Sequence, residues 1–468
     1  MMHQAIMQLL ENNISPKMIA YITVNMEIDI DEFKDYILTV IDEYSLDYIF
    51  LDGITKVHDL AEYSQWLSDW VVSKGKKVVI TGSDSLALHF LEIQGLNTRY
   101  VEVPVPPLSY SEHTRLIGNT DVSEYTRTGG IFTNELSSYS LVQDFVYQAI
   151  SANIVRSIEK NNNRALGEWL DKIPAVVSKI IHENVRLMVL RAISAAFAPR
   201  IYSDVRNTGN EVSLKLGSQE AIVNAINSAM PVDDTANISG TELNIVYNYL
   251  LNMGLIQRVS YFEGVKVADI ITMPGLIYAY GRHIVDNLKI GDFVYPESGI
   301  VTENLTTKVR NKILEQLERD ILANVILLAN YRKYVSELDF SNRVCIYRGD
   351  SSVEIDMLTI LNGDCHMYEI RRENTVTPEQ RRWLIDAAVN QDIGLRTDIV
   401  SRNVLYNGTD CLVQIGSEDR KIKEQDKNTF DTMVLDNGEE VGHGLYSDNI
   451  SINYRNVADY LGKFDLEI

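Results

Sequence analysis

Two apolar runs near the N-terminus each end in polar residues that could do chemistry. Residues 48–51 are followed by Asp52, and residues 78–80 are followed by the polar run 81–85, which contains Ser83. Short apolar runs of this kind are typical of strands covered on both faces of a parallel sheet, and open α/β sheets bind ligands at the carboxyl ends of such strands. We therefore expect Asp52 and Ser83 to share one candidate active edge. The alternative is a parallel sheet in which the aspartate is incidental.

A second set of ionisable residues lies in the C-terminal third of the chain. Residues 353–358 and 367–371 predict two strands that are joined through a tight turn at an Asn-Gly pair. Because side chains alternate along a strand, Glu369 and Arg371 are expected to share one face of the second strand. The pattern is therefore an acid, Asp356, followed across a hairpin by Glu-x-Arg. Arginine stays protonated at any working pH, so Arg371 cannot act as a general base.

Helices and strands alternate between residues 2 and 103, and this alternation must position the first set. The expected strands are residues 18–24, 48–52, 78–81 and 99–103. The expected helices are residues 2–12, 29–44, 58–73 and 86–93. Alternation of this kind implies parallel strands with right-handed crossovers. The predicted fold class of this region is α/β.

The rest of the chain predicts a mainly helical region and then a mixed one. Residues 241–252 predict a helix that is followed by two strands, 256–261 and 265–271, which is a winged-helix pattern. Such modules often bind DNA through the helix before the wing. That helix contains no Lys or Arg, which favours packing against protein. A long helix is expected over residues 301–331, and residues 415–445 are expected to be loop.

Composition and charge limit the classes of partner. The chain has 468 residues, 45% of them hydrophobic and 23% charged, which is ordinary for a globular protein of about three domains. The net charge of −22 opposes non-specific attraction to nucleic acid. A local basic cluster, residues 371–372 with 381–382 beside Trp383, could contact phosphate or be a solvated helix face.

Several kinds of site have no support in the sequence. The three cysteines are far apart and form neither a disulfide framework nor a zinc pattern, and the eight histidines show no metal-binding spacing. Gly-x-Ser-x-Gly does not occur, so we do not expect a hydrolase triad. No apolar run approaches the ~20 residues of a membrane span, and the first residues do not form a signal peptide. These features predict a cytoplasmic protein that does not enter a membrane.

Residues 1–115 resemble the AAA-type P-loop ATPases of bacteria and archaea that carry a C-terminal domain of unknown function. Residues 48–57 resemble the Walker B segment of that family, residues 78–85 resemble its sensor strand, and residues 99–110 resemble its next strand and turn. The resemblance implies ATP and Mg²⁺ as cofactors, with Asp52 as the residue that holds the metal. It also implies that Asp52, Ser83 and Arg99 are the catalytic candidates.

Two departures from the family pattern bear on activity. No Gly-x-x-x-x-Gly-Lys-[Ser/Thr] occurs in the sequence, so the phosphate-binding Walker A loop is missing. We therefore expect an N-terminally truncated core, in which the first strand of the family's 5-1-4-3-2 sheet is absent. The Walker B glutamate, which polarises the attacking water, is Gly53 here. Both departures predict impaired ATP binding and hydrolysis.

The Asp and Glu-x-Arg pattern of the C-terminal region resembles the restriction-endonuclease-like core that the same family often carries. In that core the two carboxylates hold a divalent metal, which implies that Asp356 and Glu369 are metal ligands. The core has a lysine where this chain has Arg371, so we expect no cleavage. The resemblance implies four domains: an ATPase core (1–115), a helical lid (116–210), a winged-helix-like domain (211–295) and a restriction-endonuclease-like domain (296–468).

The functional expectation is an ATP-binding protein of this ATPase family with an impaired site. The alternative is a non-catalytic interaction or scaffold protein that keeps the folds of an ATPase and a nuclease without their activities. A metal-dependent nuclease is the third and weakest reading. The expected partners are a nucleotide and a protein that binds the C-terminal half, and nucleic acid remains open.

Overall fold

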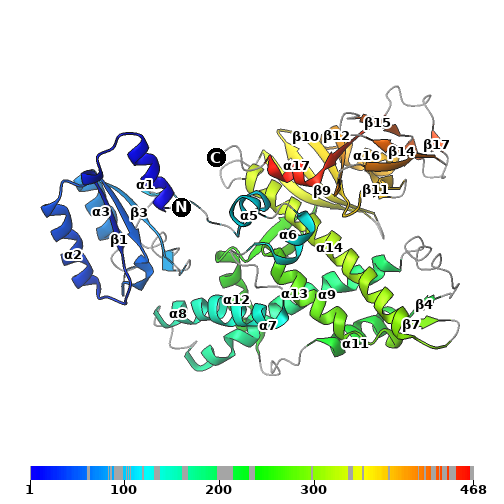
Figure 1. Ribbon diagram of the computed structural model, residues 1–468, viewed down its shortest axis with the longest axis horizontal. Coiled ribbons are helices and arrows are strands. Elements are labelled where there is room, and N and C mark those ends of the chain that lie inside the picture. The colour runs from blue at the N-terminus through cyan, green and yellow to red at the C-terminus, as the bar shows by residue number, and fades with distance from the viewer. Residues whose placement is uncertain are drawn as a thin grey trace. The chain divides into compact units, whose positions relative to one another are not determined.

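The protein is seen in a computed structural model, which describes the greater part of the chain (Figure 1). The residues described are 2–58, 60, 64–82, 84, 87–88, 99–101, 103, 105, 107–118, 121–130, 138–160, 167–197, 214–230, 238–296, 299–335, 341–349, 353–377, 380–408, 411–415, 418–422, 428–431, 433–434, 440–441 and 450–463. The chain divides into two compact units. Unit 1 comprises Met1–Val105, Asp144–Ser178 and Asp234–Gly254, and unit 2 comprises Pro106–Gln143, Lys179–Asp233 and Leu255–Ile468. The four predicted domain ranges remain predictions.

Unit 1 contains a three-stranded parallel sheet of order β1-β2-β3. The strands are β1 (Ile19–Thr23), β2 (Tyr48–Asp52) and β3 (Lys77–Ile80), and the helices between them are α1 (Met2–Glu11), α2 (Ile30–Glu43) and α3 (Ser64–Lys74). Phe33 of α2 and Trp70 of α3 pack in one apolar core with Ile49 and Leu51 of β2. The sheet therefore has the parallel α/β form that the alternating sequence predicts.

The predicted fourth strand of this sheet is wrong. The described residues 99–101 and 103 are not in a strand, and β3 is the edge of the sheet. Val101 is 87% exposed and Val103 is 65% exposed, whereas Ile49 in the central strand is fully buried. The alternating valines carry a strand signal, but a strand is stable only when its backbone groups find a partner.

Further helices follow the three-stranded sheet along the chain. Their bounds are α5 (Tyr110–Ile117), α6 (Val122–Thr128), α7 (Tyr139–Phe145), the π-helix η4 (Val146–Ser151), α8 (Ala152–Lys160), α9 (Ile173–Ala196), α11 (Gln219–Ala229), α12 (Gly240–Asn252) and α13 (Pro274–Asn287). Two short antiparallel pairs accompany them, β4 (Leu214–Leu216) with β7 (Val294–Pro296), and β5 (Ile256–Ser260) with β6 (Val267–Ile271). No described helix is long and apolar enough to cross a membrane.

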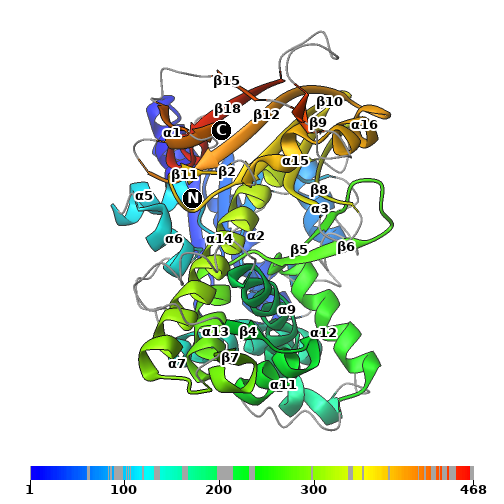
Figure 2. The same ribbon diagram turned by 90° about the vertical axis from the view of Figure 1, so that its right-hand side faces the viewer.

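Unit 2 is built on a six-stranded sheet of order β15-β18-β12-β10-β9-β8 (Figure 2). The strands are β8 (Asn342–Arg348), β9 (Glu354–Leu361), β10 (Asp364–Ile370), β12 (Asp398–Tyr406), β15 (Asn428–Asp431) and β18 (Ile450–Asn456). Strand β9 is antiparallel to its neighbours β8 and β10, and β10, β12 and β18 are parallel. The turn from β9 to β10 has positive φ at Asn362 (53°) and Gly363 (97°), as the Asn-Gly signal predicts.

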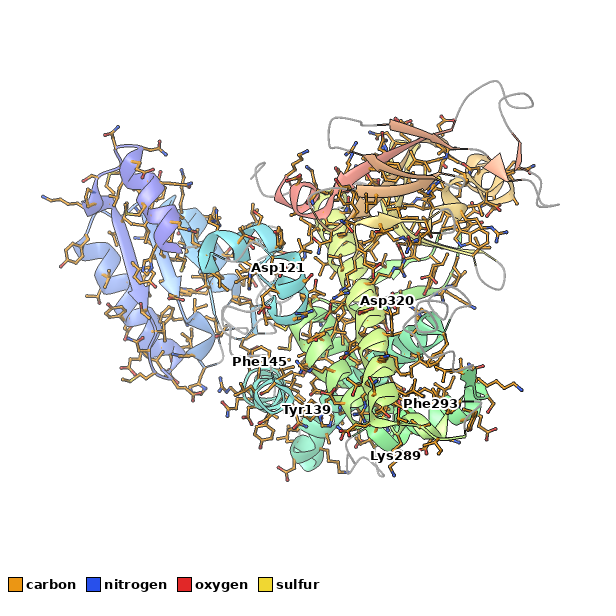
Figure 3. All side chains as sticks on the ribbon, turned by 45° about the vertical axis from the view of Figure 1, so that its right-hand side comes forward. Asp121, Tyr139, Phe145, Lys289, Phe293 and Asp320 are labelled. Atoms are coloured by element: carbon orange, nitrogen blue, oxygen red, sulfur yellow. The ribbon has the colours of Figure 1, made fainter. Side chains whose placement is uncertain are left out.

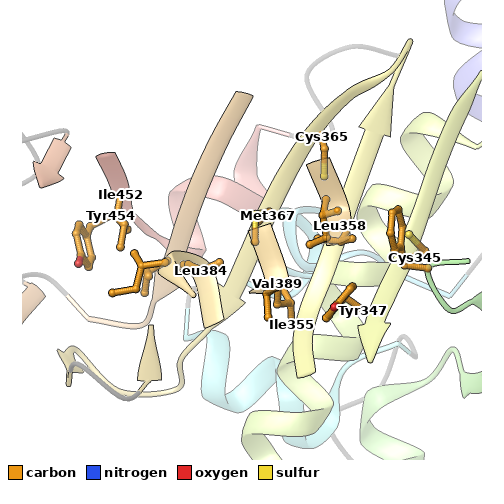
Figure 4. Packing of buried hydrophobic residues seen from close by; sticks show 14 of the residues in the cluster. Cys345, Tyr347, Ile355, Leu358, Cys365, Met367, Leu384, Val389, Ile452 and Tyr454 are labelled. Atoms are coloured by element: carbon orange, nitrogen blue, oxygen red, sulfur yellow. The ribbon is translucent and has the colours of Figure 1, made fainter. Parts of the chain in front are cut away.

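Helices cover both faces of this sheet. The 32-residue helix α14 (Glu303–Tyr334) packs on one face with α17 (Val457–Gly462), and α15 (Arg382–Ile385) and α16 (Ala387–Gly394) pack on the other. An apolar core lies on each face of the sheet, and side chains of β9 enter both. Met357 packs in the core that contains residues of α14, whereas Leu358 packs in the core on the opposite face, which Figure 4 shows. The predicted long helix is therefore present and unbroken.

The hairpin β5–β6 covers the edge of the six-stranded sheet. The backbone N–H of Phe262 donates to the carbonyl oxygen of Ile346 in β8 at 2.8 Å, and Tyr261 forms a parallel bridge with the same residue. Glu263, at the hairpin turn, makes an ion pair with Arg396. An edge strand exposes unpaired backbone groups that invite other chains, and the hairpin tip satisfies part of this edge.

One expectation for the C-terminal region is wrong. Residues 415–445 are not all loop, because β13 (Cys411–Ile415) pairs with β14 (Glu418–Ile422), β15 pairs with β18, and β16 (Met433–Val434) pairs with β17 (Glu440–Val441). The segment is polar and charged, which suggests loop from composition alone. Backbone pairing at the margin of a sheet does not require apolar side chains, so composition misleads there.

Candidate functional site

The carboxylate of Asp52 lies at the carboxyl end of β2, and hydroxyl groups from both neighbouring strands bind it. Tyr21 in β1 donates its hydroxyl to Oδ2 at 2.6 Å. Thr81, directly after β3, donates its hydroxyl to Oδ1 at 2.7 Å. Parallel pairing brings these side chains together, because the register sets Thr23 beside Asp52 and Leu51 beside Ile80. Asp52 is therefore the central acid of the predicted active edge.

These contacts keep Asp52 charged. The hydrogen bond from Tyr21 makes the largest contribution to lowering the pKa of the Asp52 carboxyl, followed by the hydrogen bond from Thr81. His3, from α1, adds a smaller electrostatic effect in the same direction, and its ring lies 4.8 Å from that of Tyr21. An ionised and partly exposed carboxylate suits a hard cation such as Mg²⁺. Asp52 could thus supply one oxygen ligand, and the remaining ligands would come from phosphate and water.

Gly53 follows Asp52 in a conformation that excludes most side chains. Its φ is +76°, and a Cβ atom at this position would lie 2.8 Å from the backbone oxygen of Val24. A glutamate here would be strained and would collide with β1's continuation, because non-glycine residues rarely adopt positive φ. The backbone at position 53 therefore favours glycine over glutamate.

The other two predicted catalytic residues do not join Asp52 in the described structure. Ser83 lies outside the described residues. Arg99 lies in coil, half exposed, and its Nη1 is 2.6 Å from Oδ1 of Asp69 on α3. Their catalytic roles remain predictions.

Unit 1 also contains a small cavity that the sequence did not reveal. It has a volume of about 240 Å³ and is lined by residues after all three strands and by one residue of α8: Asn25, Met26, Glu27, Thr55, Lys56, Asp84 and Arg156. Lys56 reaches across it and donates to the backbone oxygen of Asn25 at 3.1 Å. Its position beyond the carboxyl ends of β1 and β2 is where α/β sheets bind ligands. Thr55 and Lys56, which line it, follow Asp52 by three and four residues.

In unit 2, the carboxylate of Asp356 is bound by a guanidinium. Nη2 of Arg319, on α14, lies 2.7 Å from Oδ1 and 2.8 Å from Oδ2 of Asp356. The backbone N–H of Ile370 also donates to Oδ2 at 2.8 Å. Both oxygens of this buried side chain are therefore occupied. Figure 3 labels the neighbouring Asp320 on α14, whose Oδ1 is 3.2 Å from Nη1 of Arg319.

Glu369 lies opposite Asp356 across the β9–β10 pair, one step beyond the pair Met357 and Tyr368. The side chain is buried, and its Oε2 accepts a hydrogen bond from Nη2 of Arg371 at 2.7 Å. Oε1 has no hydrogen-bond partner among the described residues. Burial, together with the charge of Asp356, raises the pKa of Glu369 to about 8. The two predicted metal ligands are brought together, and each forms an ion pair with an arginine: Asp356 with Arg319, and Glu369 with Arg371.

A divalent metal does not fit this arrangement. Nη2 of Arg319 lies at nearly the same distance from both Asp356 oxygens, at the position where a cation bound to both oxygens would lie. Across the described parts of the chain, no group of three or more His, Cys, Asp or Glu side chains could hold a metal ion. A raised pKa further disfavours Glu369 as a ligand, because metal ligands bind in the deprotonated form.

The predicted basic cluster is also largely neutralised. Arg372 donates through Nε to Oε2 of Glu318 at 2.7 Å, and Arg127 of α6 donates to Oε1 of the same buried glutamate at 2.8 Å. Arg381 is buried, and the Arg382 guanidinium lies 4.6 Å from the centre of the Trp383 ring. Glu318 had no sequence signal, because its partners come from distant segments. Arg371 and Arg372 are thus paired with buried glutamates and Arg381 is buried, while Arg382 is exposed beside Trp383, so the four arginines do not form one solvated face.

Comparison with known proteins gives support for the N-terminal region. A search of curated proteins found no significant match. Among solved structures, the crystal structure of protein VC1899 from Vibrio cholerae aligns with 83% of this chain and 88% of its own, at 10% identity and a TM-score of 0.13, which is too low to support an argument about fold. A family model described as an AAA domain matches residues 1–114. The N-terminal region, with Asp52 at its candidate edge, is thus similar to the AAA-type ATPases.

Proposed function

We propose that the protein is an AAA-type ATP-binding protein whose site is impaired in hydrolysis. The observation that carries this proposal is Asp52, which is ionised at the carboxyl end of the central strand within the region that matches the AAA domain. When bound, Mg²⁺ would neutralise phosphate charge and link the nucleotide to the protein. Asp52 would hold the metal, while Tyr21 and Thr81 would orient its carboxylate.

The impairment has two supports. The sequence has no Walker A loop, so the backbone amides and lysine that cradle the phosphates are not present in these 468 residues. Gly53 stands in the place of the glutamate that would polarise water, and its positive φ and the proximity of Val24 oppose a return to glutamate. We infer that nucleotide binds weakly and is not turned over.

For the C-terminal half we propose a restriction-endonuclease-like fold and a winged-helix-like element that act in protein contacts, in a cytoplasmic setting. The sheet β8–β9–β10 carries Asp356 and Glu369 on adjacent strands, as that core requires, but guanidinium groups occupy them. The wing-like hairpin β5–β6 packs on β8 through Phe262 and Tyr261, which leaves its tip unavailable to a DNA groove. These contacts favour an interaction module over a nuclease.

Calorimetric titration with Mg·ATP tests the nucleotide proposal. We expect the full chain to bind more weakly than micromolar, and Asp52→Asn to abolish the binding. Asp47→Asn is the matched control, because Asp47 lies at the opposite end of β2 and contacts Lys76 at 3.4 Å. Phosphate release should be undetectable in all three proteins and in Gly53→Glu.

Three outcomes would change the proposal. Micromolar binding or turnover by the unmodified chain would contradict the impairment. Binding that survives Asp52→Asn would remove Asp52 from the site. The complete absence of binding would favour the alternative function, a scaffold protein, for which the neutralised acidic pair in unit 2 is the supporting observation.

A further inference from the structure

The carboxylates of Asp356 and Glu369 in unit 2 lie beside a cation that belongs to the chain, the guanidinium of Arg319. Every nitrogen of the Arg319 guanidinium has an oxygen partner. Nε donates to the backbone oxygen of Ile370 at 3.3 Å, Nη1 lies 3.2 Å from Asp320 Oδ1, and Nη2 bridges the two oxygens of Asp356. All three nitrogens of Arg319 thus contact oxygen atoms inside unit 2. Its contacts all point to a fixed, internal role.

The position of Nη2 is that of a metal ion. A hard divalent cation binds both oxygens of one carboxylate at about 2.0–2.6 Å, and Nη2 binds both at 2.7 and 2.8 Å. The neighbouring strand supplies Glu369, with one buried oxygen that has no hydrogen-bond partner in the described structure. Asp320 adds a third carboxylate beside the same guanidinium. The surroundings of Nη2 are those of a cation site with an arginine in it.

We propose that the guanidinium of Arg319 takes the place of a divalent metal ion between Asp356 and Glu369. The site is thereby complete without metal, and the replacement fastens α14 to the sheet at β9 and β10. The carboxylates hold together because a positive charge lies between them, and that charge belongs to the helix and not to a bound ion. This inference stands on unit 2 alone and does not depend on nucleotide binding.

The proposal predicts that removal of Arg319 opens a metal site. In Arg319→Ala the carboxylate of Asp356 would lose its cation while Glu369 keeps Arg371, which destabilises unit 2, and a divalent ion should restore what the Arg319 guanidinium supplied. The probe is Mn²⁺ alone, followed by its electron paramagnetic resonance signal and by thermal unfolding. All proteins should carry Asp52→Asn, so that metal at unit 1 does not contribute to the signal.

Four proteins make the comparison in this background. The protein with Arg319 is expected to show no bound Mn²⁺ and no shift of the unfolding temperature with Mn²⁺. Arg319→Ala should unfold at a lower temperature and recover part of the loss when Mn²⁺ binds. Adding Asp356→Asn to Arg319→Ala should abolish that recovery. Arg310→Ala is the matched control, because Arg310 lies on the same helix and donates to the backbone oxygen of Leu288.

Specific results would overturn the proposal. Mn²⁺ binding to the protein with Arg319 that is lost on Asp356→Asn would mean that metal and arginine coexist. A folded Arg319→Ala that binds no Mn²⁺ would mean that Arg319 is an ordinary ion-pair partner. If Arg319→Ala does not fold without metal, it should fold with Mn²⁺, and failure to do so overturns the proposal. Arg319→Lys keeps a cation at the site and should remain unresponsive to Mn²⁺.

Discussion

Asp52 in unit 1 and Asp356 in unit 2 are both strand carboxylates with polar partners, but the partners differ in kind. Hydroxyl groups of Tyr21 and Thr81 bind Asp52, which remains partly exposed. A guanidinium and a backbone N–H bind Asp356, whose side chain is only 8% exposed. Neutral donors leave a carboxylate its charge and its capacity to hold a cation. A guanidinium compensates the carboxylate charge and occupies the oxygens that a cation would bind. The difference separates a site that can still receive a metal from one that has been closed.

The sheets that contain these acids also differ in how well their edges are covered. In unit 1 the strand β3 has no further neighbour in the described sheet, and Val79 is 43% exposed. In unit 2 the strand β9 lies between β8 and β10, and the edge strand β8 is itself covered by the β5–β6 hairpin. We therefore expect the two acids to respond differently to mutation and the two sheets to differ in local stability.

The largest expected effect comes from truncating the acids. Asp356→Ala should lower the free energy of unfolding of unit 2 by about 3–5 kcal/mol, because it removes the carboxylate that binds Nη2 of Arg319 and leaves this guanidinium with Asp320 as its ion-pair partner. Asp52→Ala should cost unit 1 only about 1 kcal/mol, because water can replace the hydroxyl contacts. Hydrogen exchange of β9 and of β2, read separately, measures the two losses. Asp364→Ala, at an exposed position of β10, is the control and should change little. Equal losses at the two acids would contradict the comparison.

The next effect concerns the open edge of β3. The N–H groups of Lys77 and Thr81 bond to Asp47 and Leu51, so by alternation those of Val78 and Ile80 face away from β2. We expect these two amides to exchange at least about 100-fold faster than amides within β9, a difference of about 2.7 kcal/mol in local stability. Residue-resolved hydrogen exchange measures it, with Val79 as the internal reference.

Slow exchange at both Val78 and Ile80 would contradict the expectation of an open edge. It would mean that another strand, from this chain or from a second copy, covers the edge. Repeating the measurement at lower protein concentration would separate these sources, since only pairing between copies depends on concentration.

The smallest expected effect concerns the acidity of Asp52. Tyr21→Phe removes the strongest influence that lowers the pKa of Asp52, so this pKa should rise toward its ordinary value, and Thr81→Val should raise it by less. A carboxyl group whose pKa is lowered on folding contributes stability above its unfolded pKa, and this contribution is lost as the pH falls through the folded pKa. Tyr21→Phe should therefore weaken the acid dependence of unit 1 stability below about pH 4.

Carbon NMR titration of the Asp52 carboxyl is the direct measurement of that effect. Tyr36→Phe is the matched control, because Tyr36 lies exposed on α2. A titration of Asp52 that does not change in Tyr21→Phe would show that the hydroxyl contact at 2.6 Å does not control its charge.

Local pattern predicted the elements better than the contacts between them. The apolar run before Asp52 and the acid that ends it are adjacent in sequence, so the strand and the site could both be predicted. Residues 99–101 and 103 show that a strand signal is insufficient when no strand of the described sheet pairs with it. Arg319 could not be predicted as the partner of Asp356, because only the packing of α14 on the sheet brings them together. Tyr21 was missed for a similar reason, since its hydroxyl reaches Asp52 only because β1 pairs with β2.

The docking of the β5–β6 hairpin on β8 also has a consequence for the order in which the protein folds. The hairpin is local in sequence and can form early, whereas its contact with Ile346 joins segments that are far apart in the chain. Such non-local contacts slow folding, because chain entropy is lost before the contact is gained. During synthesis the β5–β6 hairpin emerges from the ribosome before β8, so β8 can pair with a hairpin that has already formed. The six-stranded sheet can thereby form with its outer edge protected, at the stage when partly folded chains are most prone to aggregate.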